Sequence, residues 1–353
     1  MSTKPLSVLV TGGAGYIGSH TTRQLVAAGH QVTVVDNLYS GHKWAVAPEA
    51  EFHECDAGDA KAMRALMESR RFDAVIHFAG HIVVPESVSD PGKYYRNNVV
   101  GSLNLIECCQ QAGVGLFVFS SSAAVYGNPA EVPVNESALT HPINPYGRTK
   151  LITEWTLQDF AERSQADSGL RFVALRYFNV AGASLDGTLG QATPEATHLI
   201  KVACETACGK RDAVSVFGTD YDTKDGTCIR DYIHVEDLAG AHLKALDYLA
   251  DGGESSILNC GYGHGYSVRE VLEMVRKVSG KHFEIEEAGR RAGDPACLVS
   301  DNRAIKERLG WKPQHDDLEI ICSSAFKWEH AGQHRTLGNR LSLIHISEPT
   351  RRS

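Results

Sequence analysis

A glycine-rich segment near the start of the chain constrains the fold more than any other feature. The apolar run from Val8 to Val10 predicts a short buried strand, and glycines follow at positions 12, 13, 15 and 18. Beyond Gly18 the apolar residues follow helical spacing until Gly29, a residue type that often ends a helix. The order of strand, glycine-rich turn and helix predicts the first half of a βαβ unit, whose helix N-terminus attracts phosphate groups.

The spacing Gly12-x-x-Gly15-x-x-Gly18 differs from the usual dinucleotide-binding pattern G-x-G-x-x-G, so the glycines alone also fit an ordinary strand-to-helix turn. The next predicted strand, over 31–35, ends at Asp36. A carboxylate at this place holds the ribose 2′-hydroxyl of NAD and repels the additional phosphate of NADP. Because no arginine follows directly, the two features together predict NAD.

Strands and helices alternate along the rest of the first half. Apolar runs predict strands over 51–55, 74–78, 116–119 and 171–177, with helical spacing between them. The alternation predicts an α/β fold, a doubly wound Rossmann-type parallel sheet covered by helices on both faces. Because ligands of such folds bind at the carboxyl ends of the strands, the residues that follow each strand are candidates for the binding site.

One long helix is predicted from Asp90-Pro91, a common helix start, to Gly113, a common helix end. Asn97 and Asn98 lie in its middle, and one of the two amides is a candidate for facing inward to support the cofactor site.

No pattern after about His330 predicts another helix or strand. Three further segments have helical spacing: 194–209, 236–249 and 267–278.

Hydrophobic residues make up 42% and charged residues 22% of the 353 residues, values typical of soluble globular proteins. The net charge of −8 argues against general nucleic-acid binding, and no apolar run is long enough to span a bilayer. The nine cysteines include no C-x-x-C pair, and the sixteen histidines include no H-E-x-x-H motif. These features predict a cytoplasmic protein with reduced thiols and without a metal site.

The segment Tyr146-Gly-Arg-Thr-Lys150 carries the predicted chemistry, because Tyr146 and Lys150 share one face of a helix. A free tyrosine has a pKa of about 10, so only ~0.1% is phenolate at pH 7. A lysine ammonium about 5 Å away contributes roughly 3 kcal/mol at an effective dielectric of ~20, which predicts a pKa about 2 units lower. Tyr146 is then a predicted general base for a sugar or alcohol hydroxyl, and Ser122 is predicted to orient that hydroxyl.

The combination of TGGAGYIG, Asp36, Ser122 and the Tyr146/Lys150 pair resembles the extended short-chain dehydrogenase/reductase superfamily. Within it, five longer segments resemble the UDP-glucose 4-epimerase family, and the likeness covers about Leu6 to Trp328. The segments are HFAG (77–80), SSSAAVYG (120–127), NPYGRTK (144–150), RYFNVAG (176–182) and VFGTDYDTKDGTCIRDYIHV (216–235).

The resemblance implies the interconversion of UDP-glucose and UDP-galactose. Tyr146 takes the proton of the sugar 4-hydroxyl while a hydride passes from C4 to NAD. The 4-keto sugar then turns over in the site and receives the hydride on its other face, so that NAD is regenerated and stays bound. The resemblance also implies a homodimer that pairs the predicted helices 90–113 and 146–160.

Most of the implied cofactor contacts come from residues 1–176, the predicted NAD-binding domain. The glycines Gly12, Gly15 and Gly18 are predicted to approach the pyrophosphate. The further NAD-lining residues that the resemblance implies are Tyr16, Ile17, Asp36, Asn37, Asp56, Ala57, Phe78, Ala79, Gly80, Asn97, Lys150 and Tyr177.

The resemblance assigns the UDP-sugar mainly to residues 177–331, with some segments returning to the first domain. Phe217 is implied to pack on uracil, and Arg230 and Arg291 to bind the diphosphate through planar guanidinium groups. Residues 332–353 match nothing in the family and are predicted to be a disordered or foreign tail. The implied substrate-binding residues are Ser122, Tyr146, Asn179, His198, Leu199, Phe217, Arg230, Arg291 and Asp294.

Three positions depart from the family pattern. Ile82 stands where the best-known members have lysine, which removes one polar contact to the cofactor. His198 stands where asparagine is frequent. Leu298 stands where bacterial members can have tyrosine, and its smaller side chain predicts room for N-acetylated sugars.

Other functions fit the sequence less well, or are left open by it. A nucleotide-sugar 4,6-dehydratase needs an acidic pair after the active-site serine, where this chain has Ala123-Ala124. A 4-epimerase acting on UDP-xylose and UDP-arabinose stays open. A protein that senses NAD without turnover has no need of Ser122, Tyr146 and Lys150 together, and a methyltransferase has no need of the tyrosine and lysine.

Overall fold

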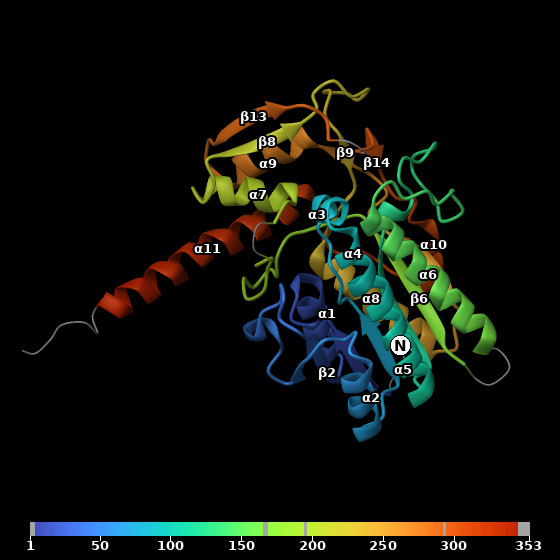
Figure 1. Cartoon of the computed structure of the whole chain (residues 1–353). Helices are drawn as coiled ribbons and strands as arrows, with labels where there is room; N and C mark the ends of the chain where they lie inside the picture. The colour runs from blue at the N-terminus through green and yellow to red at the C-terminus, as the bar shows by residue number, and fades with distance from the viewer. Residues whose placement is uncertain (1–3, 165–168, 194–195, 292–293, 345–353) are drawn as a thin grey trace, which may run out of the picture.

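A seven-stranded parallel sheet forms the centre of the molecule (Figure 1). The computed structural model describes residues 4–164, 169–193, 196–291 and 294–344. The prediction of an α/β fold around a parallel sheet is confirmed. In spatial order the strands are β11 (Ser256–Cys260), β6 (Arg171–Tyr177), β5 (Leu116–Ser122), β4 (Ala74–His77), β1 (Ser7–Thr11), β2 (Gln31–Asp36) and β3 (Glu51–Glu54).

Side chains of the central strands point alternately to two apolar cores, one on each face of the sheet. On β1, Val8 and Val10 belong to one core and Leu9 belongs to the other. Burial on both faces explains why the strands are continuous apolar runs rather than alternating ones. Helices α1 (Tyr16–Ala27) and α8 (Val235–Ala250) cover the first face, and α2 (Ala60–Ser69), α5 (Gly101–Ala112) and α6 (Pro145–Ser164) cover the second.

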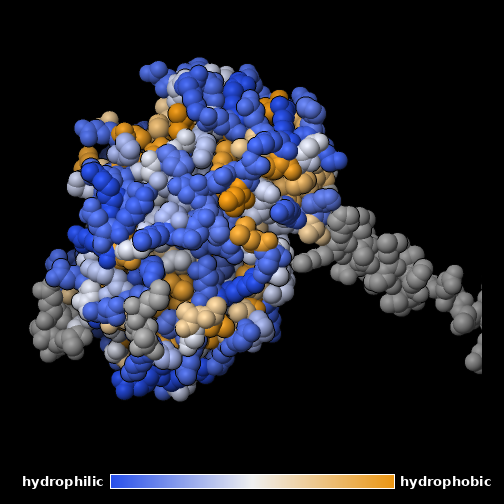
Figure 2. All heavy atoms as spheres, turned by 180° about the vertical axis from the view of Figure 1, so that it is seen from behind, coloured by the Kyte–Doolittle hydropathy of each residue, from blue (hydrophilic) through white to orange (hydrophobic). Residues whose placement is uncertain are grey.

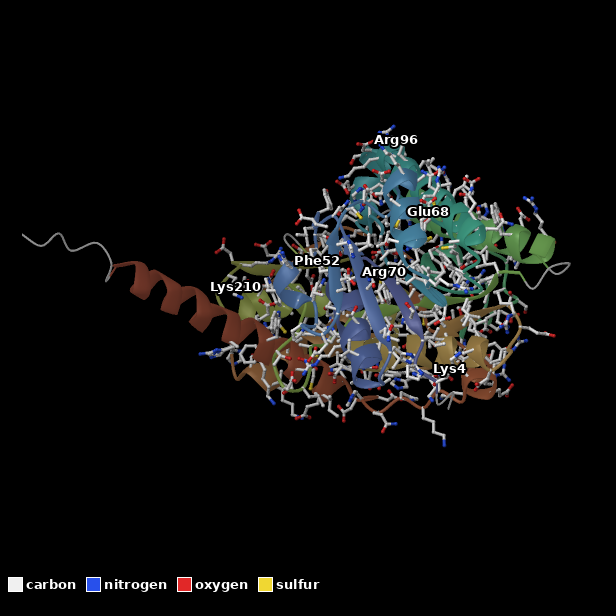
Figure 3. The ribbon with its side chains drawn as sticks, turned by 90° about the horizontal axis from the view of Figure 1, so that it is seen from below. Lys4, Phe52, Glu68, Arg70, Arg96 and Lys210 are labelled. Carbon is white, nitrogen blue, oxygen red and sulfur yellow. The ribbon has the colours of Figure 1, made fainter. Side chains whose placement is uncertain are left out.

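Charged side chains protect the edge of the sheet at β3. The guanidinium group of Arg70 forms an ion pair with Glu51, and the ammonium group of Lys43, in the short helix η1 (Lys43–Ala45), lies 5.6 Å from the ring centroid of Phe52. Figure 3 shows Phe52 and Arg70 beside the blue strands on this side of the sheet. Such charges discourage an edge strand from pairing with another chain.

Besides α8 and β11, the described residues of the second half form three small sheets and four more helices, most of them in the upper part of Figure 1. The first core continues from the large sheet to Val214 and Val271, so one apolar core joins the two halves. The small sheets pair β7 (Asn179–Ala181) with β10 (Tyr232–His234), β8 (Ala213–Phe217) with β13 (Glu284–Ala288), and β9 (Ile229–Arg230) with both β12 (Tyr266–Ser267) and β14 (Cys297–Leu298). The helices are α7 (Leu199–Ala207), α9 (Val268–Ser279), α10 (Arg303–Leu309) and α11 (Leu318–Ile344).

The predicted helix over 90–113 is helical throughout but is not one regular helix. After the short helix α3 (Val84–Ser89), it consists of α4 (Pro91–Tyr94), a π-helical turn η2 (Tyr95–Val100) and then α5. Asp90 caps it by accepting a hydrogen bond from the Lys93 N–H at 3.1 Å, and Gly113 ends it in the left-handed conformation with φ of 72°. A π-helical turn inserts an extra residue and is frequent at functional sites.

Other boundaries also differ from the prediction: β5 runs to Ser122 rather than to 119, and α6 runs to Ser164 rather than to 160. Helix α7 begins at Leu199, five residues after the predicted start at 194, and residues 194–195 lie outside the described residues. No element was predicted after about His330, whereas the backbone of α11 is helical to Ile344 and its end extends away from the body of the molecule (Figure 1). The rest of the predicted tail, 345–353, also lies outside the described residues.

Among the described residues, the helices lack the combination of length and apolar character that crossing a membrane requires. The face opposite to that of Figure 1 shows small groups of apolar side chains separated by polar ones (Figure 2).

Candidate active site

The turn between β1 and α1 has no room for side chains at its glycines. Gly12 has φ of 72°, and a Cβ atom on it would lie 2.6 Å from the backbone nitrogen of Ala79. A Cβ atom on Gly18 would overlap the carbonyl oxygen of Gly12. Helix α1 starts at Tyr16 and its N-cap residue, Gly15, provides no side-chain cap. The glycines therefore let the turn pack closely on the segment after β4 and on the start of α1. The N–H groups of the first turn of α1 are suited to bind phosphate.

Asp36, at the end of β2, links the glycine turn to the following loop. Its buried carboxylate accepts hydrogen bonds from the Ala14 N–H at 3.0 Å and the Leu38 N–H at 2.8 Å. Burial raises the pKa of Asp36, and these two hydrogen bonds oppose the shift. The adjacent Asn37 amide lies 3.5 Å from the carboxylate of Asp56, which follows β3. The acidic residues at the ends of β2 and β3 thus lie at the same edge of the sheet, and Ala57, next to Asp56, is buried.

The segment after β4 lies beside the glycine turn. The N–H groups of Phe78 and Ala79 both donate to the carbonyl oxygen of Thr11, at 2.9 and 3.2 Å. A Cβ atom on Gly80 would lie 3.3 Å from the Asn98 amide oxygen and 3.8 Å from Lys150 Nζ. This small residue therefore keeps the space between the glycine turn and the predicted catalytic lysine open.

Of the two neighbouring asparagines in η2, Asn98 is the buried one, whereas Asn97 was the predicted cofactor ligand. The Asn98 amide oxygen accepts from the His81 N–H at 2.8 Å and from the Asn97 side chain at 2.8 Å. Its amide nitrogen donates to Thr149 Oγ1 at 3.1 Å. Asn98 thereby ties the segment after β4 to helix α6, and sequence reasoning identified the inward asparagine only as one of a pair.

Tyr146, Lys150 and Ser122 come together where α6 passes the carboxyl end of β5. Tyr146 is 8% exposed and Lys150 is 4% exposed. Lys150 Nζ donates to the carbonyl oxygen of Ser120 at 2.7 Å and lies 6.0 Å from the ring centroid of Tyr146. Ser122 is hydrogen-bonded to the Tyr146 side chain and also accepts from the Ala124 N–H at 3.2 Å.

Tyr177, predicted to line the cofactor site, ends β6 beside this group. Its hydroxyl is hydrogen-bonded to Ser120 Oγ. The backbone carbonyl of Ser120 is also the acceptor for Lys150, so Ser120 contacts both predicted cofactor residues. Tyr177 and Ser122 are directly opposite each other in the register of β5 and β6.

Burial dominates the electrostatics of the predicted base. It raises the pKa of Tyr146 above its ordinary value, and the hydrogen bond with Ser122 opposes this shift. Burial also lowers the pKa of Lys150 to about 8, although the Glu154 carboxylate raises it. The overall shift of the Tyr146 pKa in the chain by itself is therefore upward, opposite in direction to the lowering predicted from Lys150, because desolvation of the phenolate dominates.

A buried ion pair supports helix α6 one turn beyond Lys150. The Glu154 carboxylate accepts from Arg176 Nε at 2.9 Å and from Arg176 Nη2 at 2.6 Å, and also accepts from Ser121 Oγ. Arg176 Nη1 donates to the Tyr126 hydroxyl at 3.0 Å. Sequence reasoning missed this network, although the spacing of four residues between Lys150 and Glu154 placed both on one helix face.

In the second half, the structure pairs predicted substrate residues that are far apart in the sequence. The Arg291 guanidinium carbon lies 3.7 Å from the ring centroid of Phe217. Arg230 Nη2 lies 3.5 Å from the Asp294 carboxylate, and Leu298 is opposite Arg230 in the pairing of β14 with β9.

Asn179 and the start of α7 lie elsewhere in this half. Asn179 begins β7, and its backbone N–H donates to the carbonyl oxygen of Asp231 at 2.9 Å. His198 is the N-cap residue of α7, directly before Leu199, and its Nδ1 lies 3.0 Å from the Gln191 amide nitrogen. His198 and Gln191 line a small cavity with Gly182. Gly182 also accepts a hydrogen bond of 2.6 Å from the hydroxyl of Tyr16, so this cavity adjoins a predicted cofactor residue.

Within the part of the chain that the structure describes, one group of side chains could hold a metal ion, although no metal site was predicted. The ligand atoms of His234, Glu236 and His315 lie within 4.8 Å of one another. His234 Nδ1 accepts from the Glu236 N–H, and His234 Nε2 contacts Ser324 Oγ, both at 3.2 Å. Both ring nitrogens of His234 therefore already have protein partners.

A glycine-rich turn, an acidic residue after the second strand and a Ser–Tyr–Lys set at one sheet edge define a class of enzymes that oxidise and reduce hydroxyl groups with a nicotinamide cofactor. The chain belongs to the NAD-dependent epimerase/dehydratase family, whose model matches residues 8–261. It is 54% identical over 324 residues to the UDP-glucose 4-epimerase of Azospirillum brasilense, a match that covers 92% of each chain.

Two solved structures share both fold and sequence with the chain. The UDP-glucose 4-epimerase from Brucella ovis, in complex with NAD, is 45% identical with a TM-score of 0.88, covering 92% of this chain and 98% of that one. The UDP-Glc/GlcNAc 4-epimerase from Campylobacter jejuni is 53% identical with a TM-score of 0.81, covering 92% and 99%. These similarities confirm the family that the sequence motifs predicted.

Proposed function

We propose that the protein is an NAD-dependent 4-epimerase that interconverts UDP-glucose and UDP-galactose. The observation that carries this function is the meeting of Ser122, Tyr146 and Lys150 beside the glycine turn, in a chain that is 54% identical to a UDP-glucose 4-epimerase. The chemistry needs one base at the sugar 4-hydroxyl and a hydride acceptor at C4. Tyr146 is the candidate base, and the glycine turn is the candidate site for a cofactor that accepts the hydride.

The residues present fit NAD. The cradle at Gly12 and Gly18 has no room for side chains, the first turn of α1 has no side-chain cap, and Asp36 stands where the adenosine ribose is held. Asn37, Asp56 and Gly80 complete the proposed lining. When bound, NAD supplies a reversible hydride acceptor for sugar C4.

The chain's own residues handle the proton. Tyr146 Oη removes the proton from the sugar 4-hydroxyl in the oxidation step and returns it in the reduction step. Ser122, hydrogen-bonded to Tyr146, orients that hydroxyl. Lys150, fixed by the Ser120 carbonyl, holds a positive charge near the phenol and the cofactor ribose. The positive charge of oxidised NAD favours the phenolate that burial disfavours.

We further propose that residues 1–176 hold the cofactor and that residues 177–331 mainly hold the sugar nucleotide. The Phe217 ring and the Arg291 guanidinium group, 3.7 Å apart, offer a flat surface for uracil and a cation for the diphosphate. Arg230 supplies a second cation, and Asp294 is placed for a ribose hydroxyl. The rest of the proposed sugar-nucleotide site is lined by His198, Leu199 and Asn179.

The test is conversion of UDP-galactose by the purified protein without added cofactor. The expected result is formation of UDP-glucose, detected by chromatography, with no net appearance of NADH absorbance. If neither the purified protein nor the protein with added NAD converts UDP-galactose, the proposed function is wrong. UDP-xylose as a second substrate distinguishes the pentose alternative.

We propose N-acetylated UDP-sugars as second substrates. Leu298 is smaller than tyrosine, lies opposite Arg230 and packs against a buried cluster that includes Val125, three residues beyond Ser122. The Campylobacter jejuni relative, named as acting on both glucose and N-acetylglucosamine forms, supports this substrate range.

The Leu298→Tyr variant is expected to lose activity on UDP-N-acetylglucosamine by about 10- to 100-fold in kcat/KM, because the added ring fills the space for the acetamido group. Its kcat/KM for UDP-glucose is expected to stay within about threefold. Substitution of the neighbouring Cys297 by alanine is the control. Equal losses on both substrates would contradict this account of Leu298.

We propose that the active protein is a homodimer built on α6 and the helical segment 90–113. Trp155 on α6 is 52% exposed, Val100 at the end of η2 is 50% exposed, and α6 contacts η2. Large exposed apolar side chains on adjacent helices favour association with a second copy of the same surface.

The Trp155→Glu variant is expected to sediment as a monomer at concentrations where the original protein is a dimer, because the charge would be buried unpaired at the interface. The Leu139→Glu variant, at an 82% exposed loop position outside these helices, is expected to remain dimeric. A dimeric Trp155→Glu variant, or a monomeric original protein, would exclude this interface.

We also infer a cytoplasmic location. All nine cysteines carry free thiols, which suits a reducing compartment. Cell fractionation checks this inference, and recovery of the protein mainly outside the cytoplasmic fraction would contradict it.

A further inference from the structure

We propose that Tyr39 and Lys93 form a strap across the nucleotide crevice and slow the release of NAD. The proposal rests on the proposed function, because it assumes that NAD is the bound nucleotide. It assigns a cofactor-retaining role to two residues that lie outside the catalytic Ser–Tyr–Lys group.

The topology of the sheet places the two ends of the strap on opposite sides of the crevice. The chain runs outward from β1 to β2 and β3, and then returns to β4 on the other side of β1. Dinucleotides bind at such a reversal, outside the carboxyl ends of the strands. Tyr39 lies in the segment after β2, whereas His81 and Lys93 lie in the segments after β4.

Direct contacts join the two sides. The Tyr39 ring packs edge-on against the His81 ring with 4.7 Å between centroids. Lys93 Nζ donates to the Tyr39 hydroxyl at 2.9 Å and to Glu86 Oε1 at 2.5 Å. The Tyr94 hydroxyl lies 2.9 Å from the other oxygen of Glu86 and 2.6 Å from the Val83 carbonyl oxygen, so its proton is shared between these two acceptors.

Hydrogen bonds hold the backbone at both ends of the strap, on the β2 side and on the β4 side. On the β2 side, the Tyr39 N–H donates to Asn37 Oδ1 at 3.1 Å, and the preceding residue, Leu38, has φ of 58°, a left-handed conformation that is strained for a leucine. On the β4 side, the Asn98 side chain bonds both the N–H and the carbonyl of His81, at 2.8 and 3.0 Å. The anchors fix the backbone, so release requires the side-chain contacts between Tyr39, His81 and Lys93 to separate.

The side chain of Tyr39 is largely exposed to solvent, as expected of a contact that must break to release the cofactor. Tyr39 is 62% exposed, so its contacts can break without opening either apolar core. The adjacent Ile82 is 43% exposed and offers no hydrogen bond to a phosphate. Retention at this side of the crevice therefore depends on the contacts of Tyr39.

The test measures cofactor exchange in the full-length holoenzyme. The purified protein is mixed with excess isotope-labelled NAD, desalted at intervals and denatured, and the bound NAD is analysed by mass spectrometry. Tyr39→Phe removes the hydroxyl, and Lys93→Met removes the ammonium group together with its contact to Glu86 while keeping an unbranched side chain. Each is expected to exchange NAD about 3- to 10-fold faster, the range that one hydrogen bond provides, while kcat with saturating NAD and the far-ultraviolet circular dichroism stay unchanged.

The double variant gives the sharper result. Because both substitutions break the same hydrogen bond, the double variant is expected to exchange no faster than the faster single variant. The matched control, Lys281→Met, lies in the loop after α9 and is expected to exchange at the original rate. Equal exchange rates in all variants with NAD bound would overturn the strap alone, whereas absence of bound and exchangeable NAD in the original protein would overturn the proposed function and the strap together.

Discussion

Replacement of Tyr146 by phenylalanine is expected to lower kcat by about 10²- to 10⁴-fold, the usual contribution of a positioned general base. The ring is retained, so packing around the 8% exposed side chain is preserved and the bound NAD content is expected to stay the same. The rate of conversion of UDP-galactose and the NAD released on denaturation are measured on the same preparation.

The control is Tyr248→Phe, at the far end of α8, where the hydroxyl accepts a hydrogen bond from the Glu254 N–H. This variant is expected to keep its activity. If Tyr146→Phe retains activity within tenfold of the original protein while NAD remains bound, another group must remove the proton, and the role assigned to Tyr146 is wrong.

Replacement of Arg176 by alanine is expected to lower the free energy of unfolding by about 3–5 kcal/mol, the usual effect of breaking a buried ion pair. Glu154 is fully buried and would keep its charge without its partner, and the Tyr126 hydroxyl would lose a donor. Urea denaturation followed by circular dichroism measures the change.

The matched control is the exposed ion pair between Arg269 and Glu287, whose side chains are 42% and 57% exposed. Arg269→Ala is expected to cost less than about 1 kcal/mol, because solvent screens exposed pairs. Similar losses for the two arginine variants would show that burial does not set the strength of the Glu154–Arg176 pair.

The features predicted correctly from the sequence are those that depend on neighbours along the chain. Within the glycine turn, Gly12 has a positive φ and Gly18 packs on the Gly12 carbonyl, and an acidic residue at the end of a strand is carried to the sheet edge by the strand itself. Continuous apolar strands between helices indicate a parallel sheet, because burial on both faces requires them.

The features that the sequence did not reveal depend on contacts between distant segments. The pairing of Arg230 with Asp294 needs β9 and β14 to lie side by side. The inward asparagine could not be chosen because the π-helical turn changes which residue faces the core. The pKa of Tyr146 follows from burial by the surrounding elements, which a two-residue estimate with Lys150 leaves out.

The most direct test of the central claim follows the hydrogen at C4 of the sugar. UDP-glucose labelled with deuterium at C4 is incubated with the purified protein, and the UDP-galactose formed is analysed by mass spectrometry and NMR. If C4 is oxidised and reduced on the same tightly held cofactor, the product carries the deuterium at C4. A UDP-galactose product that carries solvent hydrogen at C4 in place of the deuterium would contradict an epimerase that works through bound NAD.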